Sequence, residues 1–338
     1  MLIRMIRHIF KSGMNINIPK GSLSHTMSKK GMYYAGLVLV AVIWGANFGV
    51  SRAAMETFDP ILFAFLRFAG ALPILFLLLK LKEGNLGVSW KDAIQLAGIG
   101  LIGITALEIM VLYSIQYTTL ANASLLNVAP WPIFAALFAP LITKEKLTSR
   151  VIIGGAAAMT GVFLIILGGG EGIDLSSGHL IGNLLAFSVS IIGALSNVLC
   201  IPLMKKYSPL RVSTWYILFG TILMFPLTLG GAWGDVKWGL LTPVHYAGIL
   251  YNVLICTVVA FIVWNGSMLR VGAARANFFR YAVPAASGIA GYFFFDEAIS
   301  AWQIGGTVFM AAGLVWISLE KTPVRPSHGE PIATKDAM

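Results

Sequence analysis

Charged side chains are scarce in this sequence. Asp, Glu, Lys and Arg make up 11% of its 338 residues, whereas they make up about a quarter of a soluble globular domain. Hydrophobic residues make up 57%. A fold that exposes its whole surface to water is therefore excluded, and the composition indicates a polytopic membrane protein.

Groups that bind metals or carry out catalysis are also few. The two cysteines, Cys200 and Cys256, lie in apolar runs, and the five histidines have no paired spacing, so neither a disulfide framework nor a metal site is expected. No phosphate-binding GxxxxGK(S/T) motif occurs, which excludes an ATPase of that class. No catalytic set of side chains can be placed at membrane depth. We therefore expect neither an enzyme nor a cofactor, and any transport would be driven by gradients.

Long apolar runs, in contrast, fill most of the chain. Each is about 20 residues long, enough for a helix to cross a hydrocarbon core of roughly 30 Å. Short polar breaks separate them. The sequence therefore predicts an all-α protein with ten transmembrane helices, at residues 33–54, 60–81, 92–116, 119–142, 148–168, 179–203, 211–232, 244–268, 272–295 and 299–319.

The net charge of +10 is explained by the loops that carry it. Of the 24 Lys and Arg residues, 20 fall on the side of the membrane that holds the N-terminus, and such loops stay in the cytoplasm. This bias predicts a multi-pass protein of the cell (inner) membrane with both termini cytoplasmic, and no nucleic-acid partner. Residues 1–32, which lack a secretory signal, and residues 321–338 are predicted to be cytoplasmic tails.

The chain contains an internal repeat. Two segments superpose without a gap at an offset of 152 residues, and this alignment pairs Pro132 with Pro284, Glu145 with Glu297, Gly154 with Gly306 and Gly161 with Gly313. The repeats are predicted to span residues 33–169 and 178–320, with five helices each. Because five is odd, the second copy enters the membrane in the opposite orientation. Such inverted repeats are typical of transporters that alternate access around a midplane site.

Several motifs carry a family resemblance. The segment "WGANFGVSRAA" at residues 44–54, the "LRF" at 66–68 and the doubled pattern of Pro, Glu and Gly resemble the EamA-like family of the drug/metabolite transporter superfamily, over residues 33–320. The resemblance implies a central cavity walled by helices 1, 3, 4, 6, 8 and 9, and export of amino acids or other small metabolites. It marks as family positions, most of them structural, Trp44, Asn47, Arg67, Pro132, Glu145, Pro284 and Glu297.

Glu108 is the one charged residue between Asp92 and Lys144. On a helix it shares a face with Thr105, Leu112 and Gln116. A carboxylate in low dielectric either pairs with a cation or takes up a proton, so we predict a proton or cation site here. The alternative is a neutral glutamate that only packs helices together.

Arg280 is predicted to share a helix face with Asn277, Tyr281 and Pro284 and cannot lose its charge by deprotonation. It either lines the cavity or reaches back to cytoplasmic headgroups. If it lines the cavity, Glu108 and Arg280 either pair directly or stand apart and bind the ammonium and carboxylate of a zwitterion. The second arrangement is the preferred hypothesis. Arg67 is instead predicted to be structural and to bind either helix-end carbonyls or outer-face carboxylates such as Asp59 or Glu56.

Further polar residues on the predicted cavity helices line a substrate path or hold the helices together. Those assigned to the substrate site are Asn47, Gln116, Asn127, Trp131, Asn197, Asn277 and Tyr281; Ser51, Asn183, Ser190 and Asn252 extend the pattern, and Tyr113, Trp131 and Trp264 are aromatic candidates for its apolar part.

Together these features predict a secondary transporter with Glu108 as its proton or cation site. The leading interpretation is an exporter of small polar metabolites such as amino acids. Two alternatives remain at this stage. One is an uncoupled facilitator, and the other is a flippase for lipids or lipid-linked substrates. The expected partners are a small molecule, protons or cations and the bilayer, and the chain is expected to be a monomer or a homodimer.

Overall fold

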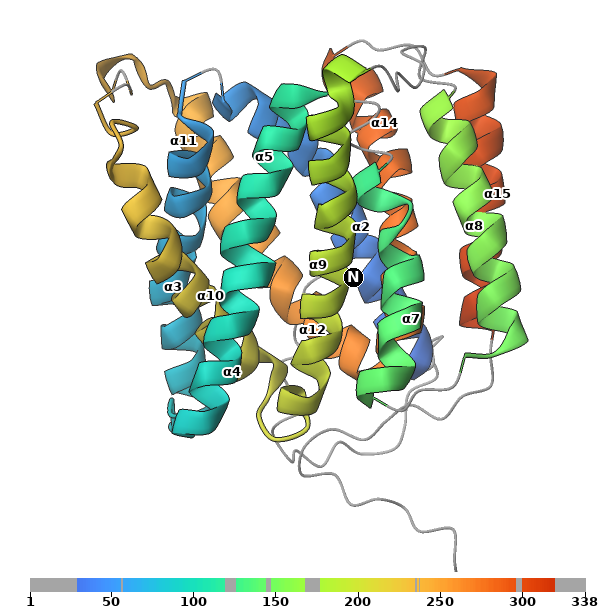
Figure 1. The fold of residues 1–338 in the computed structure, drawn as a ribbon, viewed down its shortest axis with the longest axis horizontal. Helices are drawn as coiled ribbons and strands as arrows, with labels where there is room; N and C mark the ends of the chain where they lie inside the picture. The colour runs from blue at the N-terminus through green and yellow to red at the C-terminus, as the bar shows by residue number, and fades with distance from the viewer. Residues whose placement is uncertain are drawn as a thin grey trace, which may run out of the picture.

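The structure is a computed structural model that describes residues 29–55, 57–118, 126–143, 147–167, 177–234, 236, 238–295 and 300–319. Within these ranges all regular secondary structure is helical (Figure 1). Seven of the described helical segments are long and apolar enough to cross a membrane, namely Pro60–Glu83, Trp90–Ser114, Leu126–Thr143, Leu180–Met204, Pro209–Leu229, Pro243–Val271 and Ala301–Ser318. The chain is therefore an all-α polytopic membrane protein. Residues 1–28 and 321–338 of the predicted tails, Glu56, Glu145 and Glu297 lie outside the described residues, as do the side chains of Ser51 and Gln116; residues 29–32, predicted as tail, belong to the first helix.

The first half of the chain forms the helices α2 (Lys29–Met55), α3 (Pro60–Glu83), α4 (Trp90–Gly100), η1 (Leu101–Ala106), α5 (Leu107–Tyr117), α7 (Trp131–Thr143) and α8 (Ser149–Leu167). The second half forms η2 (Ser177–His179), α9 (Leu180–Met204), α10 (Pro209–Met224), η3 (Phe225–Leu229), η4 (Trp238–Leu240), α11 (Pro243–Leu250), η5 (Tyr251–Val259), α12 (Ala260–Val271), α13 (Ala273–Phe278), η6 (Phe279–Tyr281), α14 (Ala282–Phe295) and α15 (Ala301–Ser318).

Two helices of the two halves begin in the same way. Asp59 caps α3 by accepting a hydrogen bond from the Leu62 amide, and Pro60 follows at the first helical position. Ser208 caps α10 by accepting from the Arg211 amide, again with a proline directly after it. A capping side chain accepts a hydrogen bond from an amide that would otherwise have no partner. The first helical position tolerates proline because no N–H is needed there.

Two of the long helices contain a π-helical stretch. The segment η1 joins α4 to α5, and η5 joins α11 to α12. Shifted by the repeat offset of 152, residues 101–106 fall inside η5, so both repeats carry the distortion at the same place. A π-helical turn accommodates one extra residue and turns the following side chains relative to the preceding ones. Glu108 and Thr257 lie in or just after these stretches.

Helices α8 and α15 run side by side at one edge of the bundle (Figure 1), and glycines form their contact. A Cβ on Gly154 would lie 2.8 Å from the Gly313 carbonyl oxygen, and one on Gly313 would lie 2.4 Å from the Gly154 carbonyl oxygen. Gly161 and Gly306 approach each other in the same reciprocal manner. The two helices are therefore antiparallel. Each glycine packs against the repeat equivalent of the other glycine on its own helix.

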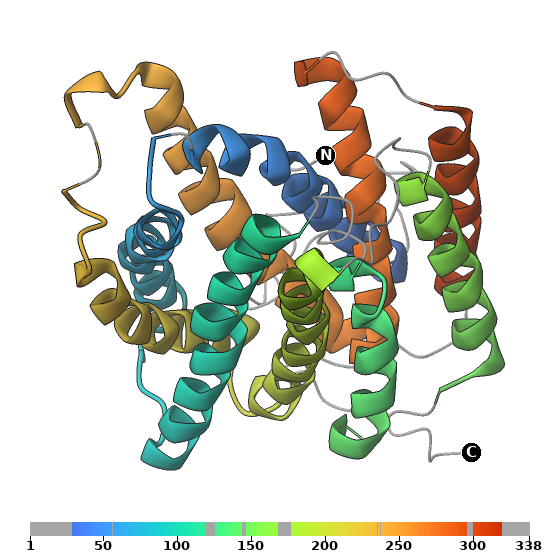
Figure 2. The ribbon, with the colours of Figure 1, turned by 45° about the horizontal axis from the view of Figure 1, so that its top comes forward.

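The remaining contacts also come in matched pairs. Helix α2 packs against α14 and α9 packs against α7; likewise α5 packs against α9 and α12 packs against α2. Figure 2 shows α2 crossing the bundle beside α14. The core between these helices includes the fully buried side chains of Leu37, Phe68 and Leu75. Helices of both halves therefore enclose the middle of the molecule.

At one end of the bundle, ion pairs between side chains connect the two halves of the chain. Glu83 pairs with Arg211 at 2.7 Å and Asp92 pairs with Lys206 at 2.8 Å. The Tyr207 hydroxyl also donates to Asp92, at 2.8 Å. The hydrogen bond to Asp92 raises the pKa of Lys206, so this contact persists throughout the neutral range. We call these five residues the ionic tie.

Candidate functional site

A cavity lies between the two halves of the bundle. It encloses about 1410 Å³ of space, open solvent included. The helices implied by the family resemblance all contribute to its wall, and α3 and α10 contribute in addition. The polar side chains on the wall are Asn47, Arg67, Glu108, Asn127, Ser196, Asn197, Tyr216 and Arg280.

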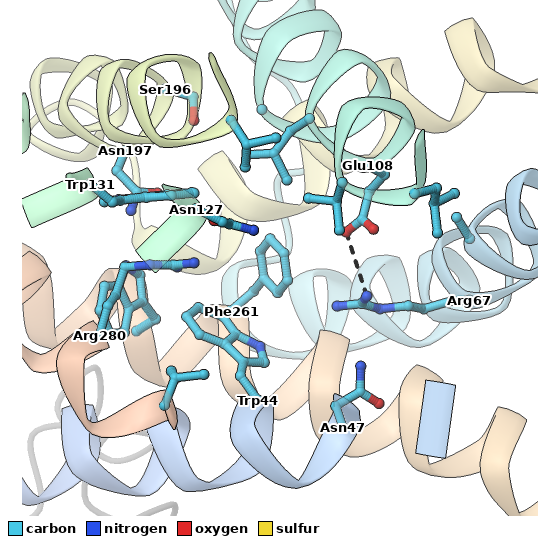
Figure 3. A pocket seen from close by; sticks show the side chains of 18 of the residues that line it. Trp44, Asn47, Arg67, Glu108, Asn127, Trp131, Ser196, Asn197, Phe261 and Arg280 are labelled. Atoms are coloured by element: carbon cyan, nitrogen blue, oxygen red, sulfur yellow. Dashed lines mark hydrogen bonds and ion pairs between the residues drawn. The ribbon is translucent and has the colours of Figure 1, made fainter. Parts of the chain in front are cut away.

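Glu108 meets a cation in this cavity (Figure 3), but the cation is Arg67. The Arg67 Nη1 lies 3.5 Å from the Glu108 Oε1, and the two side chains are 11% and 18% exposed. Arg67 comes seven residues after Pro60, about 10 Å along α3, so its side chain reaches the cavity wall. The predicted pairing with Asp59 is wrong, because Asp59 is used to cap α3.

A threonine of the second repeat completes this contact. The Arg67 Nε donates to the Thr257 Oγ1 at 2.9 Å, and Thr257 in turn donates to the Asn252 carbonyl at 2.8 Å. Thr257 belongs to the π-helical segment η5. Thr257 was not among the residues predicted from the sequence. The repeat offset could have identified it, because that offset matches Thr257 with Thr105, which lies on the same helix face as Glu108.

Arg280 lies in the cavity wall among tryptophan rings. Its guanidinium carbon is 3.6 Å from the centre of the Trp131 ring, 5.2 Å from that of Trp44 and 6.0 Å from that of Trp264. Its Nε is buried without a hydrogen-bond partner. Among the described residues, it has no ion pair. Of the two positions left open by the sequence, the structure has the cavity one.

Glu108 and Arg280 do not pair with each other. Figure 3 shows them on opposite sides of the cavity, with Phe261 between them. The predicted direct pair is therefore absent, and the binding of a zwitterion between the two separated side chains stays a prediction. The cavity thus offers a lone guanidinium on one wall and an arginine–carboxylate pair on the other.

Two predicted binding residues lie behind the wall. Asn277 and Tyr281 are fully buried and are not part of the cavity lining. The Asn277 Oδ1 accepts hydrogen bonds from the Trp131 Nε1 at 2.9 Å and the Asn197 Nδ2 at 3.0 Å. The Tyr281 hydroxyl donates to the Ala129 carbonyl at 2.7 Å. Asn277 therefore holds Trp131 and Asn197 in place, whereas Tyr281 holds the backbone two residues before Trp131.

Some described side chains of the wall have buried polar atoms without a hydrogen-bond partner. Buried side-chain atoms without a partner include Asn47 Oδ1, Asn127 Oδ1, Trp264 Nε1 and Arg280 Nε, and all four residues line the cavity. Buried polar groups are nearly always hydrogen-bonded, so such a cluster indicates a site for a polar ligand.

The residues predicted to be structural differ in their positions relative to this site. The Trp44 Nε1 donates to the Cys256 carbonyl at 3.2 Å, while its ring faces the cavity. Pro132 is buried in α7. Pro284 lies away from the cavity, in a groove with Ile165 and Ile304.

Comparison with known proteins identifies relatives. The profile of the EamA-like transporter family matches residues 31–167 and 180–319. The uncharacterized transporter YetK of Bacillus subtilis is 27% identical and covers 76% of this chain and 77% of its own length. An uncharacterized transporter of Archaeoglobus fulgidus is 26% identical, covering 82% and 94%.

Two further similarities concern the fold and a named substrate. A probable terminal-alkyne amino-acid exporter of Streptantibioticus cattleyicolor is 23% identical, covering 83% of this chain and 92% of its own length. A crystal structure of a protein with 15% identity superposes with a TM-score of 0.73, covering 85% of this chain and 98% of the other. At this identity, the last similarity concerns the fold alone.

Proposed function

Because the chain belongs to the EamA-like transporter family, we propose that it is a secondary transporter that moves a small polar metabolite across the cell membrane by alternating access. Export is the leading direction in this proposal. The observation that carries the proposal is the cavity. It lies between the repeats, within helices that can span a membrane, and it holds Glu108 and Arg280 on opposite walls.

Ten transmembrane helices in two inverted repeats, with both termini cytoplasmic, are part of this proposal. The reciprocal contacts between α8 and α15 support it. Equivalent antiparallel helices that exchange contacts in this way are related by a twofold axis perpendicular to them. In a bilayer such an axis lies in the membrane plane, as inverted repeats require.

The cavity is open toward one end of the bundle in this proposal. Its wall includes Pro60 and Phe63 at the start of α3, whereas the ionic tie joins the other end of α3 to α10. With the N-terminus inside, the tied end is cytoplasmic and the structure corresponds to an outward-open state. Breaking the tie and closing the Pro60 end would expose the same cavity to the cytoplasm.

The substrate is proposed to carry a carboxylate, and amino acids are the leading class. The Arg280 guanidinium is a planar fork suited to a carboxylate, and it lacks such a partner among the described residues. In an amino acid the ammonium would then point toward Glu108, as the zwitterion hypothesis states. The relative named as an amino-acid exporter agrees with this class.

Transport into proteoliposomes tests the proposal. We expect uptake of a radiolabelled amino acid that increases with an imposed pH gradient, and loss of that uptake in Arg280→Gln. Arg150→Gln is the control, because Arg150 contacts Leu319 and Trp316 away from the cavity. Uptake without any effect of the gradient would favour the facilitator, and movement of labelled lipid alone would favour the flippase. Full uptake by Arg280→Gln would refute the carboxylate site.

A further inference from the structure

The ionisable groups on the cavity wall do not balance. Among the described residues, two guanidinium groups, Arg67 and Arg280, and one carboxylate, Glu108, line it. Arginine stays protonated in proteins, so the wall carries one excess positive charge when Glu108 is ionised. Amides, hydroxyls, a thiol and aromatic rings supply the remaining polar groups.

The excess charge is localised at Arg280. Arg67 already has the Glu108 carboxylate at 3.5 Å and the Thr257 hydroxyl at 2.9 Å. Within the part of the chain that the structure describes, the Arg280 guanidinium contacts tryptophan rings and no carboxylate, the closest ring centre lying 3.6 Å from its guanidinium carbon. Cation–π contacts offset only part of the cost of removing a guanidinium from water. An anion that binds Arg280 therefore gains more here than it would beside a paired arginine.

We infer that the cavity selects a small organic monoanion, that is, a carboxylic acid without a free ammonium group. This inference rests on the proposed transport function; it keeps the carboxylate of the proposed substrate but replaces amino acids as the leading class. A monoanion neutralises the wall without disturbing the Arg67–Glu108 pair. A zwitterion brings no net charge, and its ammonium needs Glu108, so that Arg67 would lose its carboxylate partner. A 2-oxo acid or N-acylated amino acid thus fits the wall better than the parent amino acid.

The apolar part of the wall fits the rest of such a molecule. Leu107, Val111, Val189 and Phe261 line the same cavity as the two charged regions. In Figure 3, Phe261 projects between Arg280 and Glu108. An aliphatic skeleton attached to the carboxylate can contact these side chains, whereas an ammonium in the same place would lose its water without compensation.

Equilibrium binding to the purified full-length protein tests the inference with three probes that share an isobutyl group. These are 4-methyl-2-oxopentanoate, leucine and isopentylamine, and the tryptophans of the cavity supply the fluorescence signal. We expect the 2-oxo acid to bind about tenfold more tightly than leucine, and the amine not to bind. In Arg280→Gln the affinity for the 2-oxo acid should fall about 30-fold or more, while Arg150→Gln keeps the parent order.

A second variant moves the preference in the opposite direction. Glu108→Gln raises the excess charge of the wall from one to two, so the dianion succinate should bind about tenfold more tightly than it binds the parent. Leucine binding as tightly as the 2-oxo acid in the parent, or no gain for succinate in Glu108→Gln, would overturn the inference. If leucine nevertheless drives gradient-dependent uptake, the proposed transport function stands and only the charge selectivity fails.

Discussion

The Glu108 carboxylate lies between two opposing influences. A neighbouring cation such as Arg67 favours the ionised form of a carboxylate, whereas an apolar wall that excludes water favours the neutral form. The 3.5 Å contact with Arg67 is long for an ion pair. A small displacement of α3 relative to α5 would lengthen it further. The proposed coupling between a proton and the movement of the repeats would act through this contact.

Glu108→Gln tests that coupling. Glutamine resembles the protonated acid, so we expect the variant to fold and to exchange a carboxylate-bearing substrate, but to lose the acceleration by a pH gradient. Glu108→Asp is the matched control, because it keeps an ionisable group. Uptake and exchange in proteoliposomes measure both quantities. Gradient-driven uptake at the parent rate in Glu108→Gln would eliminate Glu108 as the proton site.

At the scale of helices, the contact between α8 and α15 depends on the absence of side chains. The Cβ of an alanine at position 306 would lie 2.6 Å from the Gly161 carbonyl oxygen and 2.8 Å from the Ile165 amide nitrogen. Backbone atoms cannot move aside as a flexible side chain can. The neighbouring Gly305 faces open space, with no atom within 4 Å of such a Cβ. Two adjacent glycines thus have opposite expected responses to the same substitution.

Gly306→Ala should therefore lower the free energy of unfolding by about 1–3 kcal/mol, the usual cost of overpacking. Gly305→Ala should leave it unchanged or raise it by up to about 1 kcal/mol, because alanine is the better helix former. Thermal unfolding of the two variants in the same detergent checks the prediction. Equal melting temperatures for both would show that α8 and α15 are not in direct contact.

The sequence predicted helices better than it predicted the contacts between them. Apolar runs bounded by polar breaks placed most of the described helices to within a few residues, because burial in lipid dictates both length and composition. The helix predicted from residue 119 is the exception, since α7 begins at Trp131. Glu108 and Arg280 were found because an ionised group is rare at that depth. The contact of Arg67 with Glu108 was missed because it depends on helix register, and the π-helical turns that shift this register have no distinct sequence signal.

For the whole molecule, orientation is the property that remains to be measured. The inverted-repeat proposal puts position 145 in the cytoplasm and position 297 outside, together with both termini in the cytoplasm. Single cysteines at the two positions, in a background without Cys200 and Cys256, should react with an impermeant reagent from opposite sides. Reaction from the same side would exclude the inverted arrangement.

In the proposed alternating-access cycle, the ionic tie would set the balance between the two open states of the whole molecule. In Arg211→Gln the Glu83 bridge, 2.7 Å long, is lost, so the tied end should open more often. If the bridge contributes about 1.4 kcal/mol to the closed end, labelling of Asn127→Cys from that side should rise about tenfold. Lys205→Gln, a change at an exposed neighbour, should have no such effect. Unchanged labelling in Arg211→Gln would mean that other contacts close this end.

The exchanged glycine contacts of α8 and α15 have a consequence for the origin of the chain. Each glycine pair joins one copy of the repeat to the other, so two separate copies of a half-length chain could meet through the same surface if one inserted upside down. A duplicated gene could then fuse the two without inventing a new contact. After fusion, each half is free to change alone. The single Arg280 and the single Glu108, neither matched by an ionisable residue at the equivalent place in the other half, are what such divergence would leave behind.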